Sequence, residues 1–296
     1  MAKFASPKTQ AISVMKQVQG KVLPSVGTVR DYEQALTHVA TWCKAERFSL
    51  RELTLEQALA YLDLRSEEVG QKTLDMNRQA IQMMFQHVTH QLKHDERLPV
   101  IKSSLPQILH SRAYTSDQVQ CIVNAQYGLN ALSTRIAYAA GLRAHELLTL
   151  LPLEEQVPSP RPALPQKFLG MEDTVPYTVH GKGGLIREVR IPVELSIELE
   201  KYYSPPDSHA PYIDRGVHYA YSYALSGGSR WSSSFSHASK RALGWSHGAH
   251  GLRHSYAQRR MIELQVKHHL KRELSLEIVS QEMGHFRPSI TETYLR

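Results

Sequence analysis

The chain has 296 residues, of which 42% are hydrophobic and 21% are charged, and its formal net charge is +7. This composition excludes wholesale disorder and fibrous repeats, and the length suits two domains better than one small core. The opening MAKFASPKTQ lacks the apolar core of a secretion signal, and no stretch approaches the roughly 18 apolar residues of a membrane span. Two cysteines, Cys43 and Cys121, are too few to crosslink such a chain, so we expect a reduced, cytoplasmic protein.

Basic residues are concentrated in two stretches. Residues 1–30 hold five lysines or arginines and no acid, and residues 229–272 hold nine with Glu263 as the single acid. Such density is typical of proteins that bind a polyanion, because each neutralised phosphate releases counterions. A solvated basic face would give the same pattern, so charge alone leaves both interpretations open. The candidate nucleic-acid contacts in the second stretch are Arg230, Lys240 and Arg241.

The first hundred residues predict a small all-α domain behind a tail. We expect residues 1–27 to form a flexible basic arm. Residues 28–100 carry three helical patterns, in which apolar residues recur at steps of three and four. Lys72 and Arg78 fall on the polar face of the third helix, which makes them further candidate nucleic-acid contacts. Residues 101–112, with their prolines and polar side chains, are expected to be a linker.

Residues 113–296 predict a larger domain that is also mostly helical. A helical segment from about Ser116 to Leu150 is followed by a proline-rich loop at 152–165, which we expect to be irregular. Residues 177–191 alternate in polarity about a Gly-Lys-Gly-Gly turn, which predicts a β-hairpin. The fold class expected is therefore mainly α with a small antiparallel β-sheet.

Four separated segments of this larger domain contain the same kinds of residue. They read AGLRAHELL (140–148), HGKGG (180–184), HGLRHSYA (250–257) and MGH (283–285), and a tyrosine follows nine residues after the last histidine. The candidate catalytic residues that they supply are Arg143, Lys182, His250, Arg253, His285 and Tyr294.

Two arginines, a lysine, two histidines and a tyrosine suit phosphodiester transesterification without a metal. Guanidinium forks bind the non-bridging oxygens of a phosphoryl transition state, and a histidine donates to the same oxygens or moves a proton. A lysine on a hairpin tip is placed to protonate a leaving 5′ oxygen. A tyrosine is the nucleophile, although at neutral pH only ~0.1% of a free phenol is ionised. The sequence predicts no metal site and no cofactor.

In this order, the four segments resemble the signature segments of the tyrosine recombinase (phage integrase) family. Each segment alone is weak evidence, and their succession behind an all-α domain of suitable size makes the resemblance specific. The matching positions, segment by segment, are Gly141, Leu142, Arg143 and Glu146, then Gly181, Lys182, Gly183 and Arg187, then His250, Arg253 and His254, and finally Gly284, His285, Thr293 and Tyr294.

The resemblance implies a role for each candidate. Arg143 and Arg253 would hold the scissile phosphate, with His250 and His285 completing the oxyanion site. Lys182 would be the general acid. Residues 28–100 would be the core-binding domain and 113–296 the catalytic domain, closing on duplex DNA.

The resemblance also implies a reaction and partners. Tyr294 would form a 3′-phosphotyrosine bond, so that strands rejoin without a nucleotide cofactor. The partner would be a double-stranded DNA recombination site, bound by a homotetramer that is monomeric when free, and the protein would be nucleoid-associated. Glu146 would position the Arg143 segment, and service to a mobile element is slightly favoured over housekeeping.

Several alternatives stay open on the sequence alone. Arg143 and Glu146 have the spacing of a structural ion pair, and His250 with His254 has a spacing found at zinc sites on helices. A non-catalytic DNA-binding relative or a type IB topoisomerase would share parts of the pattern. The sequence also ends at Arg296, whereas family members usually continue with a tail that docks on a neighbouring protomer, and its proline-rich loop is longer than usual.

Overall fold

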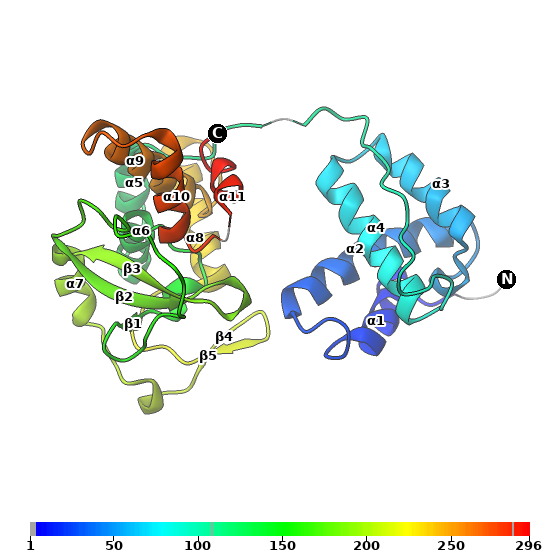
Figure 1. Cartoon of the computed structure of the whole chain (residues 1–296). Coiled ribbons are helices and arrows are strands. Elements are labelled where there is room, and N and C mark those ends of the chain that lie inside the picture. Colours follow the sequence, from blue (N-terminus) through cyan, green and yellow to red (C-terminus); the bar gives the residue numbers. More distant parts are fainter. Residues whose placement is uncertain (1–3, 108, 286) are drawn as a thin grey trace. The chain divides into compact units, whose positions relative to one another are not determined.

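The structure is a computed structural model that describes residues 4–107, 109–285 and 287–296. The chain forms two compact units, and the second begins at Leu109 (Figure 1). This boundary lies inside the segment 101–112. Each unit has a hydrophobic core of its own.

The first unit is all-α. Side-chain caps define where its helices begin, since Ser25 accepts a hydrogen bond from the N–H of Thr28, and Thr54 accepts one from the N–H of Gln57. Its elements are α1 (Pro7–Val18), α2 (Val26–Ala45), the 3-10 helix η1 (Leu50–Glu52), α3 (Leu55–Ser66) and α4 (Gln71–His87).

The expectation of a flexible arm over residues 1–27 is wrong for most of that segment. Ser6 caps α1 by accepting a hydrogen bond from the N–H of Thr9 (3.2 Å), and α1 packs against α2. Four of its apolar residues recur at helical spacing and are at most 2% exposed, which makes α1 part of the first core, whereas its lysines are exposed. The basic residues concealed this apolar stripe, whose members are Ala11, Val14, Met15 and Val18.

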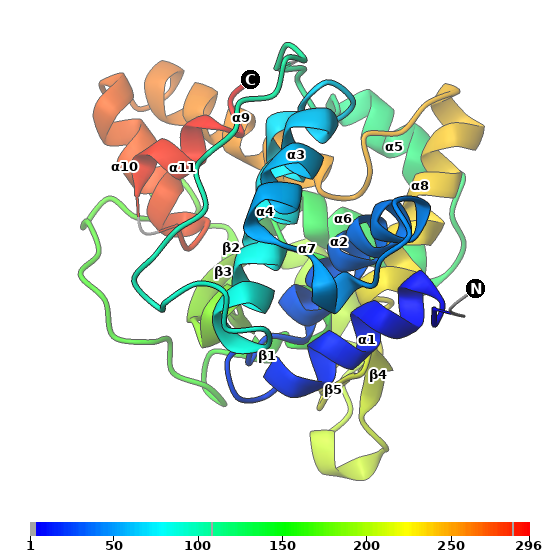
Figure 2. The same cartoon turned by 90° about the vertical axis from the view of Figure 1, so that its right-hand side faces the viewer.

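The second unit surrounds a small sheet with helices. No helix of the described residues is long and apolar enough to cross a membrane. In both views α10 and α11 lie beside α9 (Figures 1 and 2). The helices are α5 (Ser116–Asn124), α6 (Leu129–Ala140), η2 (Glu146–Leu148), η3 (Lys182–Gly184), α7 (Val193–Glu200), η4 (Pro206–Ser208), α8 (Gly228–Leu243), α9 (Gly251–Val266), α10 (Arg272–Glu282) and α11 (Pro288–Glu292).

The sheet confirms the predicted hairpin. β2 (Thr174–His180) pairs antiparallel with β3 (Ile186–Pro192), and β1 (Leu151–Pro152) adds to the other edge of β2. Alternate residues of β3 are buried, as expected for a strand with one covered face. A separate two-stranded hairpin, β4 (Tyr212–Asp214) with β5 (Val217–Tyr219), completes the strands of the described chain. The fold class, mainly α with a small antiparallel sheet, is as predicted.

The proline-rich stretch is irregular, as predicted. Between β1 and β2 the chain contains no helix or strand, and it crosses from the sheet to α10 and back. The stretch therefore contacts β3, which follows the turn that holds Lys182, and α10, which precedes His285.

Candidate active site

A single buried carboxylate, that of Glu146, gathers three arginines from separate parts of the second unit. It accepts hydrogen bonds from Arg143 Nη1 (2.7 Å) and Arg187 Nη2 (2.8 Å), and Arg253 Nη1 lies 3.8 Å from its Oε2. Burial acts to raise the pKa of Glu146, but Arg187, Arg253 and Arg143 outweigh it and hold that pKa well below its usual range. Glu146 is therefore ionised at neutral pH.

Three guanidinium groups against one carboxylate leave the cluster with two uncompensated positive charges. The remaining nitrogens of Arg143 have no partner among the described residues, and 19% of its side chain is exposed. The Nε of Arg253 is buried without a hydrogen-bond partner. The two surplus charges and the exposed part of Arg143 suit the cluster to an anion, whereas the Arg253 Nε has no accessible surface with which to contact one.

Gly141 positions two of these arginines through its backbone. It ends α6 in the left-handed conformation, at φ +61°, and its carbonyl accepts hydrogen bonds from Arg253 Nη1 and Arg187 Nη2. A Cβ at this position would lie 2.7 Å from the Tyr256 ring. Only glycine combines this backbone conformation with this close approach.

Arg253 is held rigidly near the start of α9. Its side chain has no exposed surface, and Nη2 donates to the carbonyl of Met283 (3.1 Å) and to His285 Nε2 (3.2 Å). Burial lowers the pKa of Arg253 to about 10, with Glu146 acting in the opposite direction. The group thus stays charged at neutral pH and joins the Gly141 turn to the segment after α10.

His285 has a defined tautomer. Because its Nε2 accepts from Arg253, the ring proton is on Nδ1, which donates to Thr291 Oγ1 (2.8 Å). Thr291 lies on α11, so this hydrogen bond also fixes the short helix that leads to Tyr294. Burial, followed by repulsion from Arg253 and Arg143, lowers the pKa of His285 to about 3, and the imidazole is neutral at pH 7.

Tyr294 lies within this cluster. Its ring centroid is 5.4 Å from that of His250, 4.7 Å from that of His254 and 5.1 Å from that of His285, and the Arg253 guanidinium carbon lies 5.7 Å from it. The residue is 9% exposed although it is two positions from Arg296. The spacing of nine residues after His285 therefore brings the tyrosine back to the histidine.

The other two histidines are also neutral. Desolvation, followed by repulsion from Arg253, lowers the pKa of His250 to about 4. Desolvation and Arg112 lower the pKa of His254 to about 4. Both rings are acceptors or neutral donors at pH 7, so the positive charge around Tyr294 comes from arginine.

Lys182 follows Gly181, where a Cβ would lie 3.6 Å from Glu146 Oε1, but its side chain has no described contact with the other five candidates. It is exposed on η3, in the turn between β2 and β3, which the Gly181 N–H closes by donating to the Leu185 carbonyl (2.6 Å). Gly183 and Gly184 both have positive φ there. Within the described chain no hydrogen bond or ion pair engages the Lys182 ammonium. Its role as general acid stays a prediction.

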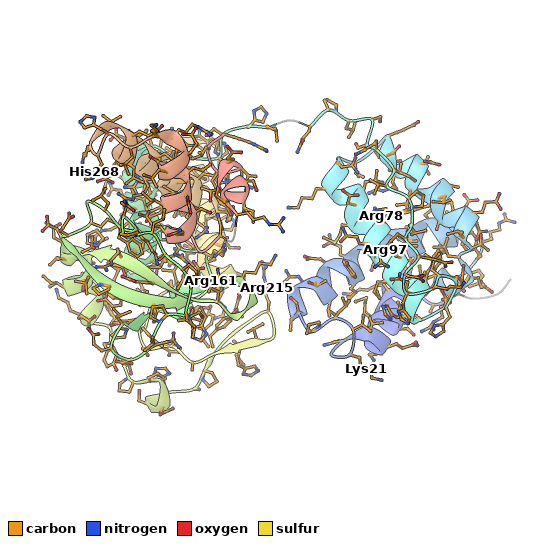
Figure 3. All side chains as sticks on the ribbon, in the orientation of Figure 1. Lys21, Arg78, Arg97, Arg161, Arg215 and His268 are labelled. Carbon is orange, nitrogen blue, oxygen red and sulfur yellow. The ribbon has the colours of Figure 1, made fainter. Side chains whose placement is uncertain are left out.

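The two candidate nucleic-acid contacts of the first unit differ in exposure and in their contacts with other residues. Lys72 is exposed on α4. Arg78, also on α4, is only 15% exposed (Figure 3). Its Nη1 donates to the Leu98 carbonyl (3.2 Å) and its Nε lies 3.6 Å from Asp75 Oδ1, so it fixes the chain that follows α4.

The candidate nucleic-acid contacts of the second unit lie on α8. Arg230 is exposed, with its guanidinium carbon 5.8 Å from the Tyr212 ring centroid. Lys240 is exposed, and Arg241 donates to the Ala125 carbonyl (2.6 Å) at the end of α5. Arg241 therefore has a structural contact, and binding of nucleic acid by all three stays a prediction.

Sequence reasoning assigned no role to two residues that build the site. Arg187, 4% exposed, donates to Glu146 and, through Nη1, to the Glu282 carbonyl (2.8 Å). Thr291 orients His285. Arg187 had a signal, since it matched the hairpin segment, whereas nothing in the local sequence marks Thr291. The positioning role expected of Glu146 agrees with its hydrogen bond to the Arg143 N–H (2.7 Å).

The ion pair between Arg143 and Glu146 exists, but the same carboxylate serves Arg187 as well, so it belongs to the cluster. His250 and His254 contact each other with ring centroids 5.7 Å apart. In the described ranges no group of three or more His, Cys, Asp or Glu is arranged to hold a metal ion.

Comparisons with known proteins identify the fold. No protein-family model and no curated protein sequence matches the chain. Among solved structures, it is similar to the XerH site-specific recombinase in a post-cleavage complex with a palindromic difH substrate, at 16% identity and a TM-score of 0.57, over 98% of this chain and 81% of that one.

Two lambda integrase structures are similar to the same degree. A dimer of residues 75–356 bound to a COC′ core site matches at 15% identity and a TM-score of 0.56, over 97% of this chain and 94% of that one. A tetramer bound to a Holliday junction matches at 15% identity and a TM-score of 0.58, over 97% and 76%. The chain has the fold of the tyrosine recombinases.

Proposed function

Starting from the tyrosine recombinase fold, we propose that this chain is a site-specific recombinase that cleaves and rejoins duplex DNA through a 3′-phosphotyrosine intermediate. The observation that carries the proposal is the position of Tyr294, whose ring contacts His250, His254 and His285 beside the arginine cluster. The ring also belongs to an apolar cluster of α9 and α10, so its position beside three imidazoles and a guanidinium group is what supports a chemical role.

Charge balance supports the chemistry. The phosphodiester carries one negative charge and an attacking phenolate brings a second, which together match the two uncompensated charges of the Glu146 cluster. Arg143, whose side chain is 19% exposed, would bind the non-bridging oxygens, and the buried Arg253 would add its positive charge. Because those cations are fixed by Glu146 and Gly141, they need little reorganisation when the phosphate arrives.

The proton steps fall to the remaining candidates. Neutral His250 would accept the phenolic proton, whereas His285, whose two ring nitrogens are engaged by Arg253 and Thr291, would hold Arg253 in place. Lys182, on the hairpin turn, would protonate the 5′ oxygen as it leaves. Tyr294 becomes esterified to phosphate while the 5′ hydroxyl departs, and attack by a 5′ hydroxyl reverses the step without a nucleotide cofactor.

Double-stranded DNA is the proposed partner. The structures of similar fold are recombinases bound to DNA, one of them a tetramer on a Holliday junction. We propose a homotetramer on DNA for this chain, with a nucleoid location and service to a mobile element following from the same function. Lys72, Arg230 and Lys240 are the exposed basic residues offered for the duplex.

The test is cleavage and rejoining of duplex DNA in EDTA by wild type, Tyr294→Phe and Tyr127→Phe. We expect Tyr294→Phe to bind the site with unchanged affinity and to cleave nothing. Tyr127, 87% exposed, is the matched control, and its variant should cleave like wild type. Equal strand transfer by Tyr294→Phe would refute the proposal, and binding without cleavage by wild type would favour a non-catalytic DNA-binding protein.

A further inference from the structure

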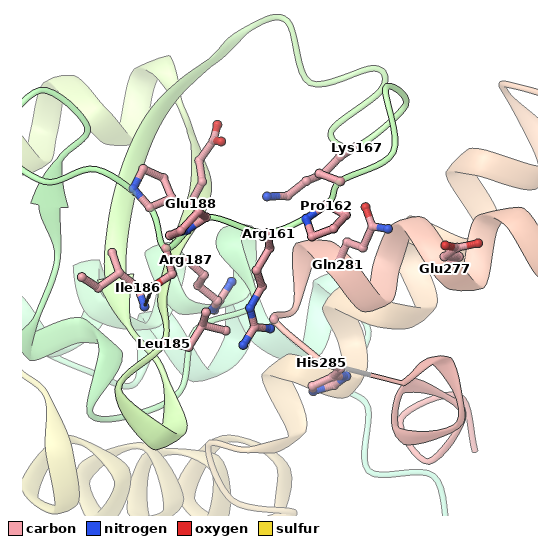
Figure 4. Close-up of a pocket in the computed structure, with 15 residues that line it drawn as sticks. Arg161, Pro162, Lys167, Leu185, Ile186, Arg187, Glu188, Glu277, Gln281 and His285 are labelled. Atoms are coloured by element: carbon pink, nitrogen blue, oxygen red, sulfur yellow. Dashed lines mark hydrogen bonds between the residues drawn. The ribbon is translucent and has the colours of Figure 1, made fainter.

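The proline-rich loop walls a cavity beside the candidate active site. The cavity has a volume of about 660 Å³, within the range typical of ligand pockets. Residues 158–163 form one wall, and the turn of the β2–β3 hairpin and α10 form the others. His285 belongs to the cavity lining and also accepts from Arg253, so the cavity borders the site at this residue (Figure 4).

This loop is fastened at both ends of the cavity wall. At one end, the Ser159 N–H donates to the Ile186 carbonyl (2.9 Å) and the Ile186 N–H donates to Ser159 Oγ (3.1 Å). At the other end, the Leu164 N–H donates to Gln281 Oε1 on α10 (2.9 Å). Prolines stiffen the span between these points because they fix φ. The wall is thus a bridge of defined position between the hairpin and the helix that precedes His285.

Arg161 lies in the middle of the bridge. Its guanidinium group is directed into the cavity, towards the space between Leu185 and His285 (Figure 4). Lys167 lines the same cavity from beyond the second anchor. Two basic side chains that the arginine cluster does not use therefore face a cavity that begins at His285.

The lining also contains two acidic residues, Glu188 and Glu277. Glu188 lies 2.6 Å from Arg190 Nη2. Glu277, which also lines the cavity, is exposed to solvent on α10. The charge of Arg187 is matched by Glu146. Arg161 and Lys167 are the basic side chains that the lining adds to the Glu146 cluster, beside apolar surface from Pro162 and Leu185; Lys167 Nζ lies 4.7 Å from the Phe168 ring centroid.

We propose that this cavity binds the nucleotide next to the scissile phosphate, with Arg161 contacting its phosphate. The inference rests on the proposed function and extends it, because it gives the loop insertion a task in placing the strand. A guanidinium fork suits a phosphodiester, and the apolar walls suit the sugar and base. Arg161 would then be a positioning residue that sets which bond meets Tyr294.

The experiment combines a protein change with a DNA change. The site duplex, selected from random sequence by binding, carries a neutral methylphosphonate one nucleotide to either side of the scissile phosphate. For wild type we expect one of the two replacements to slow cleavage at least about tenfold, since a charge-assisted hydrogen bond is lost. On unmodified DNA, Arg161→Ala should cleave more slowly than wild type by the same factor. The same methylphosphonate should slow this variant no further.

Two controls separate the outcomes. Lys201→Ala removes an exposed cation at the end of α7, outside the cavity lining, and should respond to methylphosphonates like wild type. The inference would be overturned if the loss of cleavage rate from Arg161→Ala and the loss from either methylphosphonate simply multiply when the two changes are combined. If wild type binds the duplex but forms no adduct, the proposed function fails, and the same cycle measured on Kd still decides whether Arg161 meets this phosphate.

Discussion

At the scale of single residues, the site depends on one carboxylate that neutralises part of a cationic cluster. Removing its charge would leave Arg143, Arg187 and Arg253 together in a buried place. Loss of one partner from a buried ion pair is costly because the remaining charges stay desolvated. Glu146 therefore matters to folding as well as to the position of the arginines.

Glu146→Gln should lower the free energy of unfolding by about 3–5 kcal/mol, measured by urea denaturation. Glu198→Gln is the matched control, because Glu198 pairs with Arg135 at the surface at 2.6 Å, with side chains 35% and 40% exposed. That exposed pair should contribute at most about 1 kcal/mol. Equal losses from the two variants would show that the cluster does not behave as a buried network.

The histidines around Tyr294 make stability depend on pH. Their folded pKa values, about 4 for His250 and His254 and about 3 for His285, lie below the unfolded value of about 6.5. Between those values the unfolded chain binds more protons than the folded chain, so stability is greatest above pH 6.5 and falls as the pH drops towards 4. We expect Tm to decrease steadily from pH 7 to pH 4.5.

A variant of one histidine tests the assignment. His285→Asn removes one of the three groups, so its Tm should vary less steeply over the same interval. Replacement of His38, which lies on α2 in the first unit, should leave the slope of wild type in place. A flat Tm for wild type between pH 7 and pH 4.5 would contradict neutral, buried histidines.

At the scale of elements, the turn after α6 fixes the geometry of the arginines. Gly141→Ala combines two penalties, a left-handed backbone at φ +61° and a Cβ 2.7 Å from the Tyr256 ring. Gly244→Ala, at the end of α8, has φ +82° and meets nothing within 4 Å. We expect a loss of about 1–2 kcal/mol for Gly244→Ala and about 2–5 kcal/mol for Gly141→Ala, from urea midpoints.

The comparison of these two variants isolates the close approach from the backbone conformation. Similar losses would mean that the Tyr256 ring moves aside and that the turn is less constrained than its packing indicates. A larger loss of stability for Gly141→Ala, accompanied by slower DNA cleavage, would show that the clash with Tyr256 displaces the turn. Its carbonyl is the acceptor that Arg253 and Arg187 share.

The sequence was sufficient for most elements and insufficient for their contacts. The hairpin about Lys182 and the irregular proline-rich loop follow from local patterns. The helix α1 was missed because its lysines suggested a basic arm, although the apolar stripe on its other face is continuous. Site geometry such as Thr291 on His285 depends on tertiary packing between segments, which spacing along the chain does not encode.

At the scale of the whole molecule, the two units are joined by an exposed segment. Leu105 and Leu109 are 42% and 50% exposed, and the described residues from 105 to 111 belong to no helix or strand. Each unit has its own core. Proteases act preferentially on such exposed, irregular segments.

Brief digestion with thermolysin should therefore cut first near Leu105 and Leu109 and release two fragments that resist further cleavage. Mass spectrometry of the products identifies the sites. First cuts inside α1 or the proline-rich loop would contradict the packing described for those segments, whereas protection by added DNA would show that the joining segment is covered in the complex.

The most direct test of the proposed chemistry is to identify the residue that becomes attached to DNA. Wild type would be incubated in EDTA with a nicked site duplex that traps the cleaved strand, digested, and mapped by mass spectrometry. We expect the nucleotide on Tyr294, and no adduct for Tyr294→Phe under the same conditions. An adduct on any other residue, or specific binding with no adduct at all, would contradict the assignment of Tyr294 as the nucleophile.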